Sequence, residues 1–153
     1  MKEIETLLNF YRTCSWKDRL HIRARLSTFP FRQLEELVPR HGRILDFGCG
    51  HGAFSLFMNM RSPARIIDGC DPDPSKIRCA RKACRTNPNV QMLAETAEIL
   101  QYRYDCVVCA DVLSLVKDKE RVLADLGRVL RPGGILLVKE IDKKILSKGA
   151  WAT

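Results

Sequence analysis

The chain has 153 residues, 46% hydrophobic and 29% charged, and a formal net charge of +8. This length and composition are typical of one globular domain with its own core, and the absence of any run of about 18 apolar residues argues against a membrane-spanning helix. The basic residues are dispersed, so the charge by itself does not indicate nucleic-acid binding.

Residues 1–40 are expected to form a helical cap, because apolar residues recur at helical spacing on both sides of a break at FPF, residues 29–31. The first 14 residues mix acids with apolar residues, unlike a signal peptide, so a cytoplasmic location is expected. The stretch WKDRLHIRARL, residues 16–26, sets apolar side chains among basic ones. Such a stretch can pack on a core, close a ligand site or lie on a membrane surface. Packing on the core is favoured.

Strand-like and helix-like stretches alternate from residue 43 to residue 142. The expected strands are RILDF, ARIIDGCD, NVQML, YDCVVCADVL and ILLVKEI, and the helices between them include GAFSLFMNM, PDPSKIRCARKACRTN and DKERVLADLGRVL. RPGG, residues 131–134, is expected to stop the last helix before the last strand. This alternation predicts an α/β fold with a doubly wound, mostly parallel sheet. The prediction is one domain over residues 1–153, with a core at 43–142 and a short tail at 143–153.

Seven cysteines are many for this length, and CVVC contains two of them, Cys106 and Cys109. On a strand, positions three apart point to opposite faces, whereas a redox or zinc pair needs both sulfur atoms on one side. We therefore expect reduced, buried cysteines and no metal site.

The stretch ILDFGCGHG, residues 44–52, carries the chemistry. Its glycines are one residue closer together than in the dinucleotide fingerprint G-x-G-x-x-G. Asp46 ends the strand before the loop and would repel a pyrophosphate by on the order of 1 kcal/mol or more. Asp71, about 20 residues onward, suits a ribose diol. A nucleoside with a cationic group in place of phosphates fits this pattern, and S-adenosylmethionine is such a molecule.

Four motifs in order resemble those of the class I S-adenosylmethionine-dependent methyltransferases, which have a Rossmann-like core. They are ILDFGCGHG, DGCDPDPSKIRCARK, YDCVVCADVLSLV and LRPGGILLVKE. The resemblance implies that Gly48, Cys49 and Gly50 line the methionine part of the cofactor and that Asp46 holds its amino end. It further implies a set of contacts along the rest of the cofactor: Asp71 at the ribose, Pro72, Thr96 and Ala97 at the adenine, Asp111 and Val112 near the methyl group.

The resemblance implies methyl transfer to a small-molecule or lipid acceptor. No catalytic residue is assigned, and His21, Glu140 and Asp142 are weak candidates for a base. ADVL stands where nucleic-acid methyltransferases carry Asn/Asp-Pro-Pro-aromatic, so nucleic acid is not the expected acceptor. The alternatives are a truncated or degenerate S-adenosylmethionine-binding protein without turnover and, less favoured, a nicotinamide oxidoreductase.

The family's sheet normally continues beyond the fifth strand with a helix and two more strands. About a dozen residues follow ILLVKEI, which is too few for these elements. The fifth strand is then expected to be an exposed apolar edge, and a truncated chain is the favoured explanation. The alternatives are that a partner or a second copy in a homodimer completes the sheet, or that the tail around Trp151 covers the edge.

Overall fold

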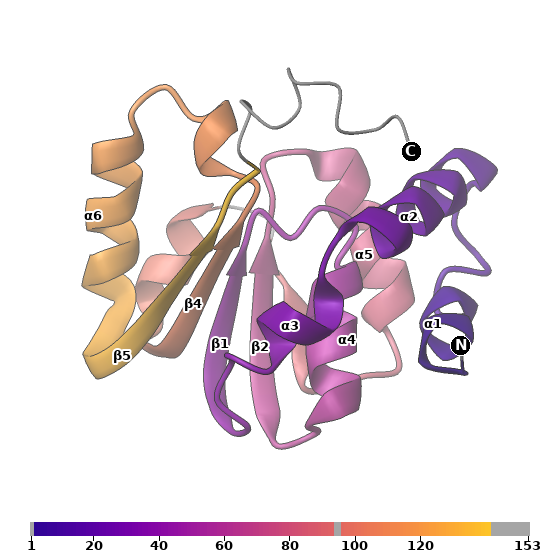
Figure 1. Ribbon diagram of the computed structural model, residues 1–153, viewed down its shortest axis with the longest axis horizontal. Coiled ribbons are helices and arrows are strands. Elements are labelled where there is room, and N and C mark those ends of the chain that lie inside the picture. Colours follow the sequence, from indigo (N-terminus) through magenta and orange to yellow (C-terminus); the bar gives the residue numbers. More distant parts are fainter. Residues whose placement is uncertain (1, 94–95, 142–153) are drawn as a thin grey trace, which may run out of the picture.

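The computed structural model describes residues 2–93 and 96–141. Five parallel strands form one sheet in the order β3-β2-β1-β4-β5 (Figure 1). The elements in chain order are α1 (Lys2–Asn9), α2 (Trp16–Thr28), α3 (Phe31–Glu35), β1 (Gly42–Phe47), α4 (Ala53–Arg61), β2 (Arg65–Cys70), α5 (Pro74–Cys84), β3 (Val90–Met92), η1 (Thr96–Gln101), β4 (Tyr104–Ala110), η2 (Leu113–Leu115), α6 (Lys119–Val129) and β5 (Leu130–Lys139). The predicted doubly wound α/β fold is confirmed.

Two apolar layers cover the sheet. Helices α1 to α5 pack on one face, and η1 and α6 pack on the other. Cys106 belongs to the first layer and Cys109 to the second, and neither side chain is exposed. This confirms that the two cysteines of CVVC point to opposite faces.

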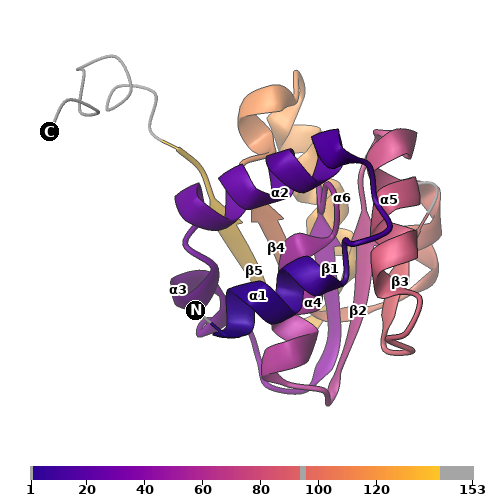
Figure 2. The same ribbon diagram turned by 90° about the vertical axis from the view of Figure 1, so that its right-hand side faces the viewer.

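The order of the strands reverses at β1: β2 and β3 are added on one side of it, and β4 and β5 on the other. Ligands of doubly wound sheets bind at such a point, outside the carboxyl ends of the strands. Helix α2 runs along this edge of the sheet (Figure 2). The cap therefore takes two of the roles left open for it: Ile22 packs into the core, while other residues of α2 wall the site.

RPGG follows the end of the helix, as predicted, but it lies within the last strand and not before it. Helix α6 ends at Val129, but β5 already begins at Leu130 and includes these four residues. Tyr104 pairs with Leu130 and Cys106 with Ile135, so β5 advances five residues while β4 advances two. The surplus residues bulge outward because Pro132 has no N–H to pair and Gly133 adopts a φ of 77°.

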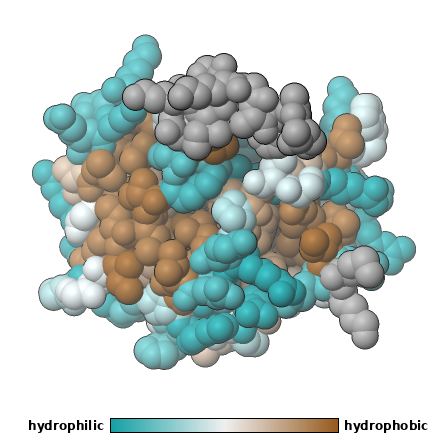
Figure 3. Space-filling model, viewed as in Figure 1, coloured by the Kyte–Doolittle hydropathy of each residue, from teal (hydrophilic) through white to brown (hydrophobic). Residues whose placement is uncertain are grey.

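Among the described residues, strand β5 forms one edge of the sheet, as expected. Ile135 and Val138 on it are 42% and 46% exposed. Hydrophobic residues gather over β5 and beside α6 in the space-filling view (Figure 3).

Candidate functional site

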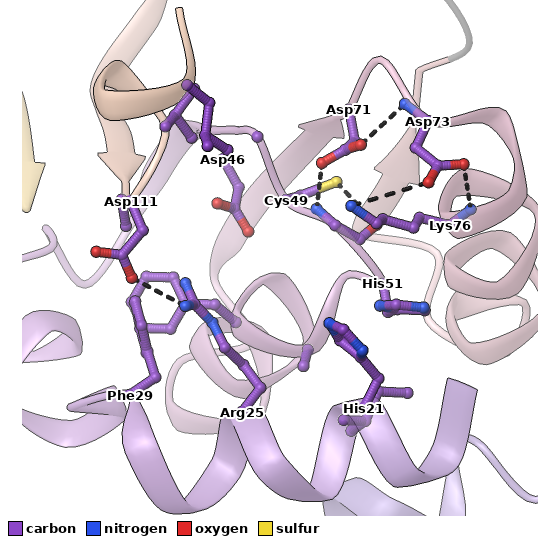
Figure 4. Close-up of a pocket in the computed structure, with 18 of the residues that line it drawn as sticks. His21, Arg25, Phe29, Asp46, Cys49, His51, Asp71, Asp73, Lys76 and Asp111 are labelled. Carbon is purple, nitrogen blue, oxygen red and sulfur yellow. Dashed lines mark hydrogen bonds and ion pairs between the residues drawn. The ribbon is translucent and has the colours of Figure 1, made fainter. Parts of the chain in front are cut away.

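A pocket of about 470 Å³ opens at the carboxyl ends of β1, β2 and β4 and is walled by α2 (Figure 4). Its size lies in the range of small-molecule sites. The residues that line it come from five segments: His21, Ile22, Arg25, Phe29 and Phe31; Asp46, Gly48, Cys49, Gly50, His51, Ala53 and Phe54; Asp71, Pro72, Asp73 and Lys76; Ala110, Asp111 and Val112; Leu115 and Val116.

The glycine loop after β1 is a tight turn that only glycine can form without strain. Gly48, Gly50 and Gly52 all have positive φ, at 79°, 57° and 74°. A Cβ on Gly48 would collide with the side chain of Val112, whereas a Cβ on Gly50 would meet no atom within 4 Å. At Gly48 the loop therefore packs against Val112, which follows β4, and at Gly50 it borders open space.

The carboxyl of Asp46 is the buried acid of the site. Its residue is only 4% exposed, and Ser55 Oγ donates a 2.6 Å hydrogen bond to Oδ2. Burial raises the pKa of Asp46 to about 6, although the Ser55 hydrogen bond and the positive charge of Arg25 act in the opposite direction. A buried carboxylate of this kind is stabilised by a cation brought into the pocket.

Asp71 is held at the end of β2 by two backbone amides. Gly50 N donates to Oδ2 and Asp73 N donates to Oδ1, each over 2.9 Å. Because each carboxylate oxygen accepts more than one hydrogen bond, both can still bind hydroxyl groups of a ligand. The first of these bonds also ties the glycine loop to the end of the neighbouring strand.

Asp111 connects the cap to the last strand across the pocket. Among the residues that the structure describes, Asp111 alone has a positive φ without being a glycine, at 60°. Arg25 Nη1 donates to its Oδ2 over 2.8 Å and Lys139 Nζ to its Oδ1 over 2.6 Å. The Arg25 guanidinium also lies over the Phe29 ring, 4.1 Å from its centroid. Asp111 therefore holds α2 in place, and strained backbone of this kind is common at functional sites.

Two histidines face each other on the other side of Arg25. The ring centroids of His21 and His51 are 5.5 Å apart, and His51 Nε2 lies 3.3 Å from Asp18 Oδ1. Tyr11 donates its hydroxyl proton to the carbonyl of His51 over 2.8 Å. Burial lowers the pKa of His51, while Asp18 opposes that shift. His51 is therefore mainly neutral near pH 7.

Most residues expected at the site from the sequence do line the pocket. They are Asp46, Gly48, Cys49, Gly50, Asp71, Pro72, Asp111 and Val112. Ala97, in η1, is exposed and is not among the lining residues. Thr96 begins η1, but its side chain lies outside the described residues.

The three candidate bases are placed differently. His21 lines the pocket, while Glu140 accepts hydrogen bonds from the backbone amides of Leu113 and Ser114. Asp142 lies outside the described residues.

Several lining residues were not predicted from the sequence, chiefly Arg25, Phe29 and Lys76. The basic and aromatic composition of residues 16–26 was the available signal for α2, since it left open that this stretch closes a ligand site.

The chain is similar to known methyltransferases. A family profile described as a methyltransferase domain matches residues 19–152. A ubiquinone/menaquinone biosynthesis C-methyltransferase, UbiE of Pasteurella multocida (strain Pm70), is 34% identical over 116 residues, which cover 71% of this chain and 43% of that protein. The human thiol S-methyltransferase TMT1B is 32% identical over 131 residues, covering 80% of this chain and 52% of that protein.

Solved structures share the fold. The plantazolicin methyltransferase BpumL, in complex with a substrate analogue and SAH, superimposes with a TM-score of 0.69 at 18% identity, covering 99% of this chain and 65% of that one. Coclaurine N-methyltransferase bound to N-methylheliamine and SAH superimposes with a TM-score of 0.63 at 18% identity, covering 71% and 35%. The chain spans about half the length of the curated relatives it matches. Among the described residues, no helix combines the length and the apolar character needed to cross a membrane.

Proposed function

The chain belongs to the class I S-adenosylmethionine-dependent methyltransferases, and on that premise we propose that it binds S-adenosylmethionine in the pocket and transfers the methyl group to a small-molecule or lipid acceptor. The observation that carries the proposal is the buried acid Asp46 beneath a loop of three glycines with positive φ. Such a loop lets a ligand approach the backbone closely, and the acid favours a cation over a phosphate.

The cofactor contacts follow the layout of the pocket. The loop Gly48–Gly50 would lie along the methionine part, with Asp46 toward its ammonium group and Asp71 at the ribose hydroxyls. Pro72, Thr96 and Ala97 would be near the adenine, and Asp111 and Val112 near the methyl group. Arg25 lies between Asp111 and Asp46 and can bind the carboxylate end of the methionine (Figure 4). Ala97 is not among the pocket-lining residues, so its place at the adenine rests on the family resemblance.

The cofactor supplies, when bound, a methyl group on a positively charged sulfur atom. The chain's residues then have to align the acceptor and keep water out. Ile22 of α2, Phe29 just after it and Phe31 of α3 serve the second purpose, since they wall the pocket with apolar surface. His21 lines the pocket and can take a proton from an acceptor hydroxyl or thiol, and so can His51, which lines it as well.

Calorimetric titration with S-adenosylmethionine and with NAD tests the ligand assignment. We expect binding of the first and none of the second. Replacement of Asp71 by Asn should weaken binding about 10-fold or more, because a charged acceptor to the ribose is lost. Asp125→Asn is the matched control, since Asp125 pairs with Arg128 on the surface of α6. NAD binding in the absence of S-adenosylmethionine binding would overturn the proposal.

Turnover distinguishes the methyltransferase from the alternative, a degenerate binding protein. Incubation with cofactor labelled in its methyl group and a fractionated cell extract should transfer label to a small molecule or lipid. Binding without transfer to any fraction supports the alternative.

The exposed face of α2 supports peripheral contact with an anionic lipid surface. Trp16 and Leu20 are 69% and 61% exposed and lie one turn apart, with the exposed Arg12, Lys17, Arg19 and Arg23 around them. Apolar and basic residues in this arrangement bind anionic headgroups. Leu115, 82% exposed, adds an apolar side chain at the pocket. Sedimentation with phosphatidylglycerol vesicles should pellet the protein, phosphatidylcholine vesicles should not, and Trp16→Ser should abolish the difference. Equal sedimentation with both vesicles would contradict this contact.

The remaining expectations belong to the same proposal. The seven free cysteines agree with a cytoplasmic location, which imaging of a tagged chain in its host would test. A second copy paired on β5 is supported by the apolar side chains on that edge strand.

A further inference from the structure

Cys14 and Cys79 lie next to each other although 65 residues separate them in the chain. Their Sγ atoms are 2.6 Å apart, and Cys14 Sγ lies 3.6 Å from the carbonyl oxygen of Cys79. A disulfide bond is about 2.05 Å long, so little movement is needed to join the two sulfur atoms. Cys14 ends the turn between α1 and α2, and Cys79 lies in the middle of α5.

The other cysteines offer no such pair. Cys70, Cys84, Cys106 and Cys109 are buried in the apolar layers, and the sulfur of Cys49 contacts Met92 Sδ. Cys14 is partly exposed, so a reagent in solution can reach it, whereas Cys79 is 4% exposed. Burial also raises the pKa of Cys79, which keeps that side chain a thiol. Cys14 is therefore the sulfur that reacts first.

The two cysteines lie at the start of the helix that walls the pocket. Cys14 directly precedes Ser15, whose side chain accepts a hydrogen bond from Asp18 N and begins α2. Cys79 belongs to the helix whose first turn supplies Lys76 to the pocket. The far end of α2 is already held by the ion pair of Arg25 with Asp111. A bond at the near end would fix α2 at both ends over the pocket.

We propose that Cys14 and Cys79 form a reversible disulfide that fastens the start of α2 to α5 and restricts the opening of the cap. The oxidant is a low-molecular-weight disulfide. The Cys14 thiolate attacks one of its sulfur atoms and expels a small thiolate. The Cys79 thiol then loses its proton to solvent as its sulfur attacks Cys14 in the mixed disulfide and expels the second small thiolate. Two cysteine thiols lose two electrons and two protons, and the small disulfide becomes two thiols.

Peptide mapping after equilibration of the full chain with oxidised glutathione tests the bond. We expect one peptide pair that joins Cys14 to Cys79 and disappears on treatment with dithiothreitol. Cys79→Ser should abolish it, while Cys84→Ala, on the same helix, should retain it. A pairing of Cys14 with another cysteine, or no cross-linked peptide, would overturn the proposal.

The effect on the cap is measured without any ligand. Closing a loop of this length should raise the Tm by roughly 10 °C in the oxidised chain, and Cys14→Ser should show no rise. Amide hydrogen exchange in α2 should slow by about tenfold or more on oxidation, because the helix can no longer separate from α5. Unchanged exchange in α2 would show that the bond does not restrict the cap.

A consequence for ligand exchange rests on the proposed function. S-adenosylmethionine should dissociate more slowly from the oxidised chain, since α2 forms one wall of the pocket. A bond that forms and slows exchange in α2 while neither form binds S-adenosylmethionine would refute the proposed function and leave the disulfide supported.

Discussion

At the scale of single residues, the buried carboxylate of Asp46 makes the pocket favour cationic ligands over anionic ones. The chain places a carboxyl group where it is 4% exposed and gives it one hydrogen bond, from Ser55. A carboxylate usually needs several such bonds or a paired cation when it is buried. The nearby Arg25 forms its ion pair with Asp111 and not with Asp46. The ionised Asp46 carboxylate therefore has no ion-pair partner of its own, and a cationic ligand can supply one.

We predict that Asp46 makes the folded chain less stable as pH rises. Burial raises the pKa of Asp46 to about 6, so between pH 4 and 6 the folded chain retains a proton that the unfolded chain releases. The stabilisation is complete below about pH 4 and is lost as pH passes about 6, by about 3 kcal/mol in total. Asp46→Asn should remove this part of the pH dependence in urea unfolding without ligand, whereas Asp125→Asn should leave it in place. Identical profiles for the two variants would contradict the prediction.

The same carboxyl should make cofactor binding depend on pH. A ligand cation favours the ionised form, so the affinity for S-adenosylmethionine should rise between pH 5 and 7 and then level off. Calorimetry at several pH values should show this rise in the natural chain and a flat, weaker profile in Asp46→Asn. A rise of equal size in both would assign the titration to another group.

How far the site could be predicted from the sequence depends on which contacts are local. Asp46 lies near the end of β1, and Asp71 and Asp111 directly follow β2 and β4. Parallel strands bring their carboxyl ends to one edge, so strand assignment alone predicts that the three lie together. The side chains of α2 were not predictable in this way. Arg25 meets Asp111 across 86 positions, and His51 meets Asp18 across 33. Which face of α2 turns to the pocket depends on such long-range contacts and leaves no periodic signal.

At the scale of elements, the glycine turn allows two effects of an added side chain to be measured separately: backbone strain at positive φ and steric collision of the Cβ. Gly48 and Gly50 both have positive φ, but only at Gly48 would a Cβ also collide with Val112. We predict that Gly50→Ala lowers the free energy of unfolding by about 1–2 kcal/mol from backbone strain. Gly48→Ala should cost a further 1–3 kcal/mol or so from overpacking. Gly127→Ala, in α6 with nothing within 4 Å of its Cβ, is the control and should stabilise the chain by about 1 kcal/mol. Equal losses at Gly48 and Gly50 in urea unfolding would contradict this difference.

The attachment of α3 to the sheet depends on a buried ion pair that composition does not reveal. Neither Arg65, at the start of β2, nor Glu35, at the end of α3, is exposed, and their Nη1 and Oε1 atoms are 2.6 Å apart. The Arg65 guanidinium also donates to the carbonyls of Pro39, Val38 and Met58.

We predict that Arg65→Met lowers the free energy of unfolding by about 3–5 kcal/mol, because it leaves three carbonyl oxygens and part of a buried carboxylate unpaired. Arg32→Met is the control, since Arg32 forms an exposed ion pair with Glu3 and should change stability by less than about 1 kcal/mol. Chemical denaturation of both variants measures the difference. A loss at Arg65 no larger than at Arg32 would mean that water replaces these bonds.

At the scale of the whole molecule, strand–helix alternation was enough to predict the layers and the parallel sheet, because right-handed crossovers leave few other arrangements. It did not predict how β5 enters the sheet. Pro132 and Gly133 predict a break between helix and strand. In the structure Leu130 pairs with Tyr104, so both residues lie within β5 and form a bulge. Whether such a segment interrupts a strand or bulges from it depends on the pairing partner, which the local sequence does not contain.

The position of β5 at the edge leads to a prediction about assembly. Its outer side has no neighbouring strand among the described residues, and Ile135 and Val138, on opposite faces of the strand, are both partly exposed. An apolar edge strand pairs readily with another chain. We predict that the mean mass in sedimentation equilibrium rises above the 17.5 kDa of one chain as the concentration increases.

Val138→Lys should keep the mass at that of one chain, because a charge on the edge opposes pairing with a second copy. Leu37→Lys is the matched control, since Leu37 is 61% exposed but lies after α3, far along the chain from β5, and this variant should associate like the natural chain. Binding of S-adenosylmethionine should be the same in both variants, because neither residue lines the pocket. A constant mass of one chain at every concentration would mean that β5 is not a contact between copies, and loss of association in Leu37→Lys alone would place the contact on the cap instead.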